Sequence, residues 1–129
     1  MKIALHVLAS PNHQANHSAF KFSQAAIAQG HQISRVFFSG EAAYTGNYLN
    51  TPPQDETNIY EQWCELSDSH GVELILCVAA ALKRGILDET EAKRYNKEQF
   101  NCTAPFIISG LGQLVEAAIE NDRLVTFGA

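Results

Sequence analysis

Short apolar segments alternate with amphipathic segments along the whole sequence, and this alternation restricts the fold more than any other feature. Five apolar runs predict strands, at residues 3–9, 33–38, 72–76, 106–109 and 123–127. The intervening segments predict helices, at residues 18–29, 55–70, 78–85 and 112–121, with a further short helix starting at 88. Strands that are separated by helices form parallel β-α-β units, and unbroken apolar runs indicate strands covered on both faces. We therefore predict an α/β fold: a three-layer sandwich with a five-stranded, mainly parallel sheet, helices on both faces and a flavodoxin-like strand order.

Local signals mark the ends of several predicted helices. Gly30 and Gly71 each follow one, and glycine commonly ends a helix because it adopts left-handed backbone angles without strain. Asp88 and Glu91 have the spacing of a variant capping box, which supports a helix that starts at residue 88. Neither a repeat nor a linker interrupts the pattern, so we predict a single domain over residues 1–129.

Composition restricts the environment and the partners of the chain. Its 129 residues carry a formal net charge of −5, a poor match to the phosphate backbone of a nucleic acid. The apolar start is short and runs into Pro11 instead of a small-residue cleavage site, so we interpret it as a strand and not as a signal peptide. No apolar run is long enough to cross a membrane. We therefore expect a cytoplasmic protein with reduced thiols that binds neither nucleic acid nor membranes.

Cys77 is the residue at which we expect the chemistry of the chain. It closes the predicted strand at residues 72–76 and is followed at once by the predicted helix at 78–85. In open α/β folds the ligand site lies at the carboxyl ends of the strands, and nearby helix N–H groups favour a thiolate. Cys77 is therefore the candidate catalytic nucleophile. The alternative is that Cys77 is a small buried apolar residue, as many cysteines are.

The other two cysteines and one histidine are secondary candidates. Cys64 lies beside Trp63 on a predicted helix, where packing is its expected role. Cys102 lies in a loop and is predicted to be more exposed, so the role of a resolving thiol is an alternative for it. His13 follows the first strand and would reach the same sheet edge as Cys77, where a His–Cys pair is a further alternative.

The sequence lacks the motifs of several common site classes. The loop after the first strand, residues 10–17, contains no glycine, which excludes dinucleotide-binding and P-loop motifs. No C-x5-R motif begins at Cys77, because position 83 is lysine and Arg84 comes one residue late, so a cysteine phosphatase is not indicated. The histidines are scattered and no C-x-x-C pair exists, so we expect neither a metal site nor a bound cofactor.

A long segment, residues 39–54, is predicted to be a loop because it contains two glycines and two prolines. It lies at the same sheet edge as Cys77. We therefore expect it to border an open groove beside the thiol, with Tyr44 and Tyr48 available for partner contacts. Because the core strands lie elsewhere, we expect the fold to survive deletion of residues 42–50. A mobile surface loop without a role is the alternative.

Several motifs together resemble the DsrE family of sulfurtransferases, in particular its TusD-type subunits. The most specific is the segment C-V-A-A-A-L-K-R-G at residues 77–85 with D-E-T-E-A at 88–92. Shorter matches are S-A-F at 18–20, G-H at 30–31, V-F-F at 36–38 and S-G-L-G at 109–112. The resemblance extends from the first to the last predicted strand, and the cysteine of the family matches Cys77. The loop that contains Cys102 lies outside the resemblance.

The resemblance implies a sulfur-relay subunit that carries a persulfide on Cys77 and needs no metal, nucleotide or redox cofactor. Such a subunit assembles with TusB-like and TusC-like subunits as a dimer of heterotrimers. It accepts sulfur from a TusA-type donor and passes it to a TusE-type acceptor, for 2-thiouridine synthesis at the wobble position of tRNA. The alternatives are a DsrE-type subunit of dissimilatory sulfur trafficking, a non-catalytic scaffold subunit with an inert Cys77, and a flavodoxin-like binder of a small ligand or flavin.

Overall fold

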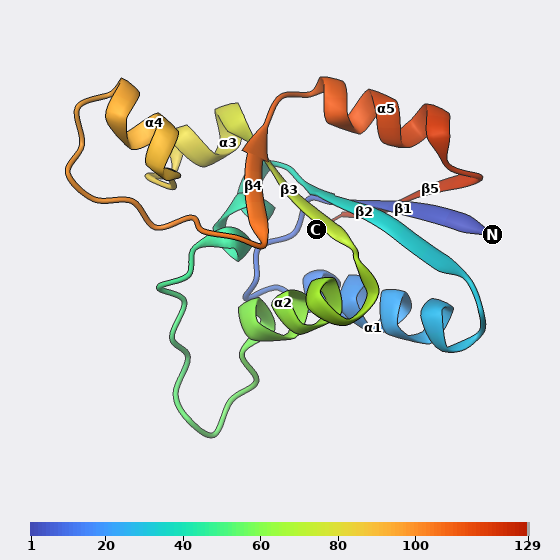
Figure 1. Cartoon of the computed structure of the whole chain (residues 1–129). Coiled ribbons are helices and arrows are strands. Elements are labelled where there is room, and N and C mark those ends of the chain that lie inside the picture. Colours follow the sequence, from blue (N-terminus) through green and yellow to red (C-terminus); the bar gives the residue numbers. More distant parts are fainter. Residues whose placement is uncertain (129) are drawn as a thin grey trace.

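In the computed structural model, which describes residues 1–128, strands and helices alternate as the sequence predicts (Figure 1). The strands are β1 (Lys2–Val7), β2 (Gln32–Phe38), β3 (Glu73–Cys77), β4 (Phe106–Ser109) and β5 (Arg123–Phe127). The α-helices are α1 (Gln14–Ala28), α2 (Ile59–His70), α3 (Val78–Lys83), α4 (Glu89–Arg94) and α5 (Gly112–Glu120). A 3-10 helix, η1 (Gly40–Gly46), follows β2.

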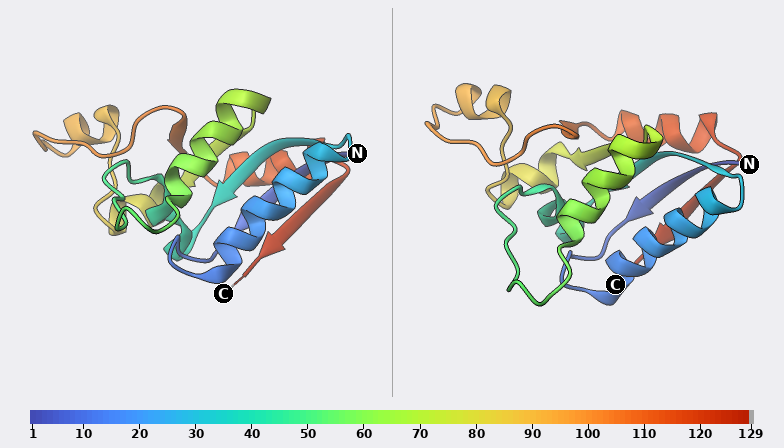
Figure 2. Two further views of the ribbon diagram at one scale, coloured as in Figure 1. Left: turned by 90° about the horizontal axis from the view of Figure 1, so that it is seen from below. Right: turned by 60° about the horizontal axis from the view of Figure 1, so that its bottom comes forward.

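The five strands form one sheet in the order β4-β3-β2-β1-β5, and every neighbouring pair is parallel. Helices α1 and α2 cover one face of the sheet and α5 covers the other, whereas α3 and α4 extend outward past β4 at the end of the sheet (Figures 1 and 2). This arrangement confirms the α/β class and the helices on both faces.

The predicted flavodoxin-like strand order is wrong. That order places β1 between β2 and β3, whereas here β1 lies between β2 and β5. The chain adds β2, β3 and β4 in one direction and then returns over the opposite face through α5 to the free side of β1. A right-handed crossover that runs in the opposite direction places its helix on the opposite face of the sheet, which is where α5 lies.

A buried polar junction holds α1, α2 and η1 together. Trp63 of α2 is fully buried, and its indole N–H donates to the side-chain oxygen of Asn16 at 3.1 Å. The amide nitrogen of Asn16 donates to the Thr45 hydroxyl of η1 at 2.9 Å and to the Ala9 carbonyl at 3.0 Å. Because each of these buried polar atoms has a partner, their hydrogen bonds offset the cost of desolvation and the junction fixes η1 against the core.

The first half of the predicted loop at residues 39–54 is part of the core. Ala42, Ala43, Thr45 and Gly46 of η1 are buried, so the premise that the core lies elsewhere is wrong, and we now expect deletion of residues 42–50 to destabilise the fold. Small side chains allow η1 to lie close to the sheet, and a Cβ added at Gly46 would collide with the side chain of Leu76. Gly46 therefore reflects close packing, not flexibility.

Helix boundaries depend on caps, which shift two of the predicted starts. α1 begins four residues earlier than predicted, because the ring nitrogen of His13 accepts the backbone N–H of Ala15 at 3.0 Å. α2 begins four residues later, at Ile59, where the Asn58 side chain acts as the cap. Asp88 caps α4 as the sequence predicts.

Candidate active site around Cys77

Cys77 lies where the sequence places it, at the junction of a strand and a helix. It is the last residue of β3, and its backbone, at φ −60° and ψ 124°, is still extended as the chain enters α3. Its side chain makes no capping hydrogen bond to α3, so the sulfur is not held by the backbone. Because β3 lies between β2 and β4, the thiol is at the carboxyl end of an inner strand, where parallel sheets place reactive groups.

Two serines flank Cys77 along the carboxyl edge of the sheet. Ser109 at the end of β4 is its paired residue in the sheet register. On the other side Phe38 pairs with Leu76, so Ser39, which continues β2 in an extended conformation, is the next neighbour of Cys77. Adjacent positions on neighbouring strands lie about 4.8 Å apart and direct their side chains to the same face. Cys77 therefore has a hydroxyl-bearing residue on each side.

Ser39 connects this edge to His6 of β1. The Nε2 atom of His6 lies 2.8 Å from the Ser39 hydroxyl, and the imidazole packs edge-on against Phe37. Burial lowers the pKa of His6 below its ordinary value of 6.5, so the ring is neutral at neutral pH. Nothing in the sequence indicates that Ser39 joins His6 to the position beside Cys77. Only the sheet register reveals that connection.

The expectation of an open groove beside Cys77 is wrong for the single chain. The residue is only 8% exposed, because η1 packs against both β3 and α3 on either side of it. An ion pair between Arg84 and Glu41, at 3.0 Å, holds α3 to η1. The predicted loop does border the cysteine, but as an ordered helix that covers it and not as the rim of a groove. A reaction partner must therefore approach a thiol that lies just beneath the surface.

The other two cysteines are less suited to chemistry at neutral pH. Cys102 is 2% exposed, and burial raises the pKa of its thiol to about 12, so the predicted exposure of Cys102 is wrong. The backbone N–H groups of Asn101 and Cys102 both donate to the Leu87 carbonyl, which draws this loop inward. Cys64 is half-buried on α2, and burial also raises its pKa, as its packing role predicts.

The structure does not bring His13 to Cys77. His13 is used as the cap of α1, and His17 on the same loop contacts the Pro11 carbonyl at 3.0 Å. Within residues 1–128, no hydrogen bond joins a histidine to Cys77, and no three histidine, cysteine or acidic side chains are grouped as metal ligands are. The geometry therefore gives no support to the alternative of a His–Cys pair.

A separate surface pocket of about 530 Å³ lies between the loop after β1 and the segment before α2. Its wall is mostly polar and includes the carboxylates of Asp55 and Glu56. His17 is the only aromatic side chain among the residues that line it. A flavin needs an apolar or aromatic surface for its ring system, and acidic groups oppose a phosphate. This pocket thus does not support the alternative of a flavin binder.

None of the helices in residues 1–128 is long and apolar enough to cross a membrane.

Comparison with known proteins matches the chain to one family over almost its whole length. The DsrE/DsrF-like family matches residues 1–127. A protein of Allochromatium vinosum named "Putative sulfurtransferase DsrE" is 50% identical over 129 residues, which cover 99% of both chains. The crystal structure of the ychN protein from E. coli superposes on this chain with a TM-score of 0.76 and covers 98% of this chain and 99% of that chain. The two sequences are 18% identical, so this similarity supports the fold. The chain therefore belongs to the DsrE/DsrF-like family.

Proposed function

We propose that this chain is a sulfurtransferase subunit that carries sulfane sulfur on Cys77. The single observation that carries the proposal is the placement of Cys77 at the carboxyl end of an inner parallel strand, where α3 begins. Membership of the DsrE/DsrF-like family and the name of the relative at 50% identity support sulfur transfer as the reaction class.

The proposed chemistry is an exchange that needs no oxidant, metal or cofactor. The Cys77 thiolate attacks the outer sulfur of a donor persulfide, a new S–S bond forms, and the donor thiolate leaves. An acceptor thiolate then attacks the outer sulfur of the Cys77 persulfide and regenerates the Cys77 thiolate. Each step breaks one S–S bond and forms another, so atoms and electrons balance. Ser39 and Ser109 occupy the neighbouring strand positions on either side of Cys77, and we propose that their hydroxyls donate to the leaving or attacking thiolate.

For the place of this reaction we propose a sulfur relay. In this relay, a TusA-type protein donates the sulfur to the chain and a TusE-type protein accepts it. The sulfur is used for 2-thiouridine synthesis at the wobble position of tRNA. The chain works in a dimer of heterotrimers together with TusB-like and TusC-like subunits. The resemblance of residues 77–92 to TusD-type subunits supports this assignment. A second candidate is a DsrE-type role in dissimilatory sulfur trafficking. The name of the Allochromatium vinosum relative favours it.

Intact mass after incubation with a small-molecule persulfide donor tests the proposal. We expect the purified chain to gain the mass of one sulfur atom and to lose it again when a thiol reductant is added. The variant Cys77→Ser should gain nothing, whereas Cys64→Ser and Cys102→Ser should load as the parent does, because burial keeps both of those thiols protonated.

Each of the three variants lacks one thiol, so all of them have the same number of cysteines. A difference in adduct formation among them therefore depends on which cysteine is missing and not on how many thiols remain. An adduct of full size on the Cys77→Ser variant would rule out Cys77 as the carrier. Absence of an adduct on the parent, at a donor concentration that loads another persulfide carrier, would favour the scaffold alternative with an inert cysteine.

A further inference from the structure

Four side chains with polar or sulfur atoms form a row along the carboxyl edge of the sheet, and all of them point to the same face. His6 of β1 pairs with Phe37 in the register, which places it diagonally beside Ser39, two residues further along β2. Cys77 and Ser109 continue the row on β3 and β4. Residues two apart on one strand, or opposite each other on neighbouring strands, share a face of the sheet. The Cys77 thiol is therefore the third member of a row that begins at His6.

His6 fixes the hydroxyl of Ser39. Its Nε2 atom lies 2.8 Å from the hydroxyl oxygen, and its ring is held edge-on against Phe37 with the ring centres 6.0 Å apart. The Nδ1 atom of His6 is not one of the buried polar atoms of residues 1–128 that lack a partner, so it is open to water. Of the two hydroxyls that flank Cys77, the one on Ser109 makes no hydrogen bond within the described residues. Ser39 is therefore the flanking serine whose hydroxyl has a fixed orientation.

The Ser39 hydroxyl lies next to the thiol but does not bond it in the unloaded chain. Within residues 1–128, no hydrogen bond joins this hydroxyl to the sulfur of Cys77. A persulfide places a second sulfur about 2.0 Å beyond the first. Because neighbouring positions in the sheet are only about 4.8 Å apart, this added length can bring the outer sulfur into hydrogen-bonding range of a hydroxyl on the next strand. The hydroxyl is therefore placed for the loaded chain and not for the free thiol.

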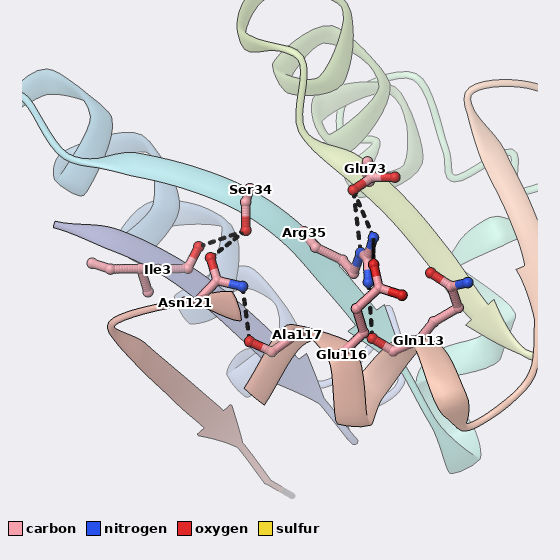
Figure 3. A network of polar contacts seen from close by, with 8 residues as sticks. All are labelled: Ile3, Ser34, Arg35, Glu73, Gln113, Glu116, Ala117 and Asn121. Atoms are coloured by element: carbon pink, nitrogen blue, oxygen red, sulfur yellow. Dashed lines mark hydrogen bonds and ion pairs between the residues drawn. The ribbon is translucent and has the colours of Figure 1, made fainter. Parts of the chain in front are cut away.

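The outer sulfur of a persulfide carries a negative charge at neutral pH, and the arginines of the surrounding elements are already paired. Arg35 on β2 pairs with the carboxylates of Glu73 at 2.9 Å and Glu116 at 3.3 Å (Figure 3). Its position is about 13 Å along the strand from the row. Arg84 at the end of α3 pairs with Glu41 at 3.0 Å. An enclosed anion without a free guanidinium beside it depends on hydrogen-bond donors, so a directed hydroxyl is the group that it needs.

We propose that Ser39, held by His6, binds the outer sulfur of the Cys77 persulfide. The Nε2–H of His6 donates to the Ser39 oxygen, which leaves the single hydroxyl proton of Ser39 free to donate to the charged sulfur. Ser39 touches the sulfur and His6 acts only through Ser39, so His6 is a positioning residue. The pair stabilises the persulfide over the thiol and retains the sulfur until an acceptor arrives. This inference rests on the proposed role of Cys77 as the sulfur carrier.

The loading equilibrium measures this site. The chain is equilibrated with a fixed ratio of glutathione persulfide to glutathione, and intact mass gives the loaded fraction. Ser39→Ala should shift the equilibrium about tenfold towards the unloaded chain, because a hydrogen bond to a charged group is lost. Alkylation of the unloaded thiol by iodoacetamide should keep its rate within about twofold, since no hydrogen bond of the described residues joins Ser39 to the thiol in that state.

Ser34→Ala is the matched control. It removes a hydroxyl from the same strand, five residues before Ser39, where that hydroxyl bonds the side-chain oxygen of Asn121 at 2.6 Å (Figure 3). We expect this variant to lose stability in urea unfolding but to load as the parent does. Equal loading of the parent and Ser39→Ala, or an equal loss in the two serine variants, would overturn the sulfur site alone. A parent that does not load would refute the carrier role of Cys77 and the site with it.

Variants of His6 test its positioning role. His6→Gln keeps an N–H group that can donate to Ser39, whereas His6→Leu removes it. We expect His6→Gln to load within about threefold of the parent, and His6→Leu to lose about as much as Ser39→Ala. The double variant of His6→Leu and Ser39→Ala should load as Ser39→Ala alone does, because His6 acts through Ser39. Losses that add in the double variant would show an independent structural effect of His6 and overturn its positioning role.

The ring nitrogens of His6 give a readout that does not depend on sulfur transfer. By nitrogen NMR of the unloaded parent we expect the ring proton on Nε2, and we expect the Nε2 resonance to shift when sulfur is loaded. A proton on Nδ1 would overturn the proposal. In that case Nε2 would accept the Ser39 proton, and none would be left for the sulfur.

Discussion

The three cysteines of this chain differ in burial: Cys64 is half-buried, Cys77 is 8% exposed and Cys102 is 2% exposed. Cys102 is enclosed by its own loop, with its thiol 3.8 Å from the Phe106 carbonyl, and the pKa of that thiol is raised to about 12. Cys64 is half-buried on α2, and its pKa is also raised. Sequence position correctly placed Cys77 at the end of a strand, but it could not reveal exposure. Exposure depends on how η1 and the loop around Cys102 pack in three dimensions.

His6 should make the stability of the chain depend on pH. Its pKa is lowered in the folded chain because burial disfavours the charged ring, whereas the unfolded chain titrates near the ordinary value of 6.5. As the pH falls below 6.5, the unfolded chain therefore takes up a proton that the folded chain resists, and folding stability is lost. Urea unfolding on either side of this pH measures the effect.

The variant His6→Gln is the control for this effect, because glutamine can still bond the Ser39 hydroxyl but does not titrate. We expect the parent to lose more stability than the variant when the pH is lowered from neutral to about 5.5. The remaining histidines contribute equally to both chains. The same loss in parent and variant would show that His6 is not responsible.

At the scale of elements, the strands and the caps at Gly71 and Asp88 were predictable, whereas the starts of α1 and α2 and the 3-10 helix were not. Strands β4 and β5 have the predicted bounds, because apolar runs of this length have few alternatives inside an α/β fold. The 3-10 helix η1 was missed because glycine, which marks a turn in most sequences, here permits close packing on Leu76. Histidine as a helix cap, as at the start of α1, gives no signal that a pattern can detect.

Gly46→Ala tests whether η1 belongs to the core. The added methyl group would collide with the Leu76 side chain, so we expect the free energy of unfolding to fall by about 1–3 kcal/mol. Gly112→Ala, at the start of α5, is the matched control because no atom lies within 4 Å of its added Cβ. Its stability should change by less than about 0.5 kcal/mol. Equal effects in urea unfolding would mean that η1 is loosely held.

At the scale of the whole molecule, the acidic balance determines which macromolecules the chain can bind. The net charge of −5 predicts that the isolated chain has no measurable affinity for tRNA at physiological salt. Fluorescence anisotropy of labelled tRNA, titrated with the chain and repeated at reduced salt, measures this directly. In the proposed relay, tRNA binds to the modifying enzyme downstream. A micromolar complex that weakens as salt is added would contradict the prediction.

The position of β1 in the sheet has a consequence for synthesis on the ribosome. β1 is hydrogen-bonded on one side to β2, which is the next strand to be synthesised. On its other side it is hydrogen-bonded to β5, which is the last strand to be synthesised. One row of backbone groups of β1 therefore remains unpaired while the intervening residues are translated. An unpaired strand edge is prone to pair with other chains. We therefore expect the nascent chain to be prone to aggregation until β5 emerges, and a cell-free translation mixture depleted of chaperones should yield more aggregate than a complete one.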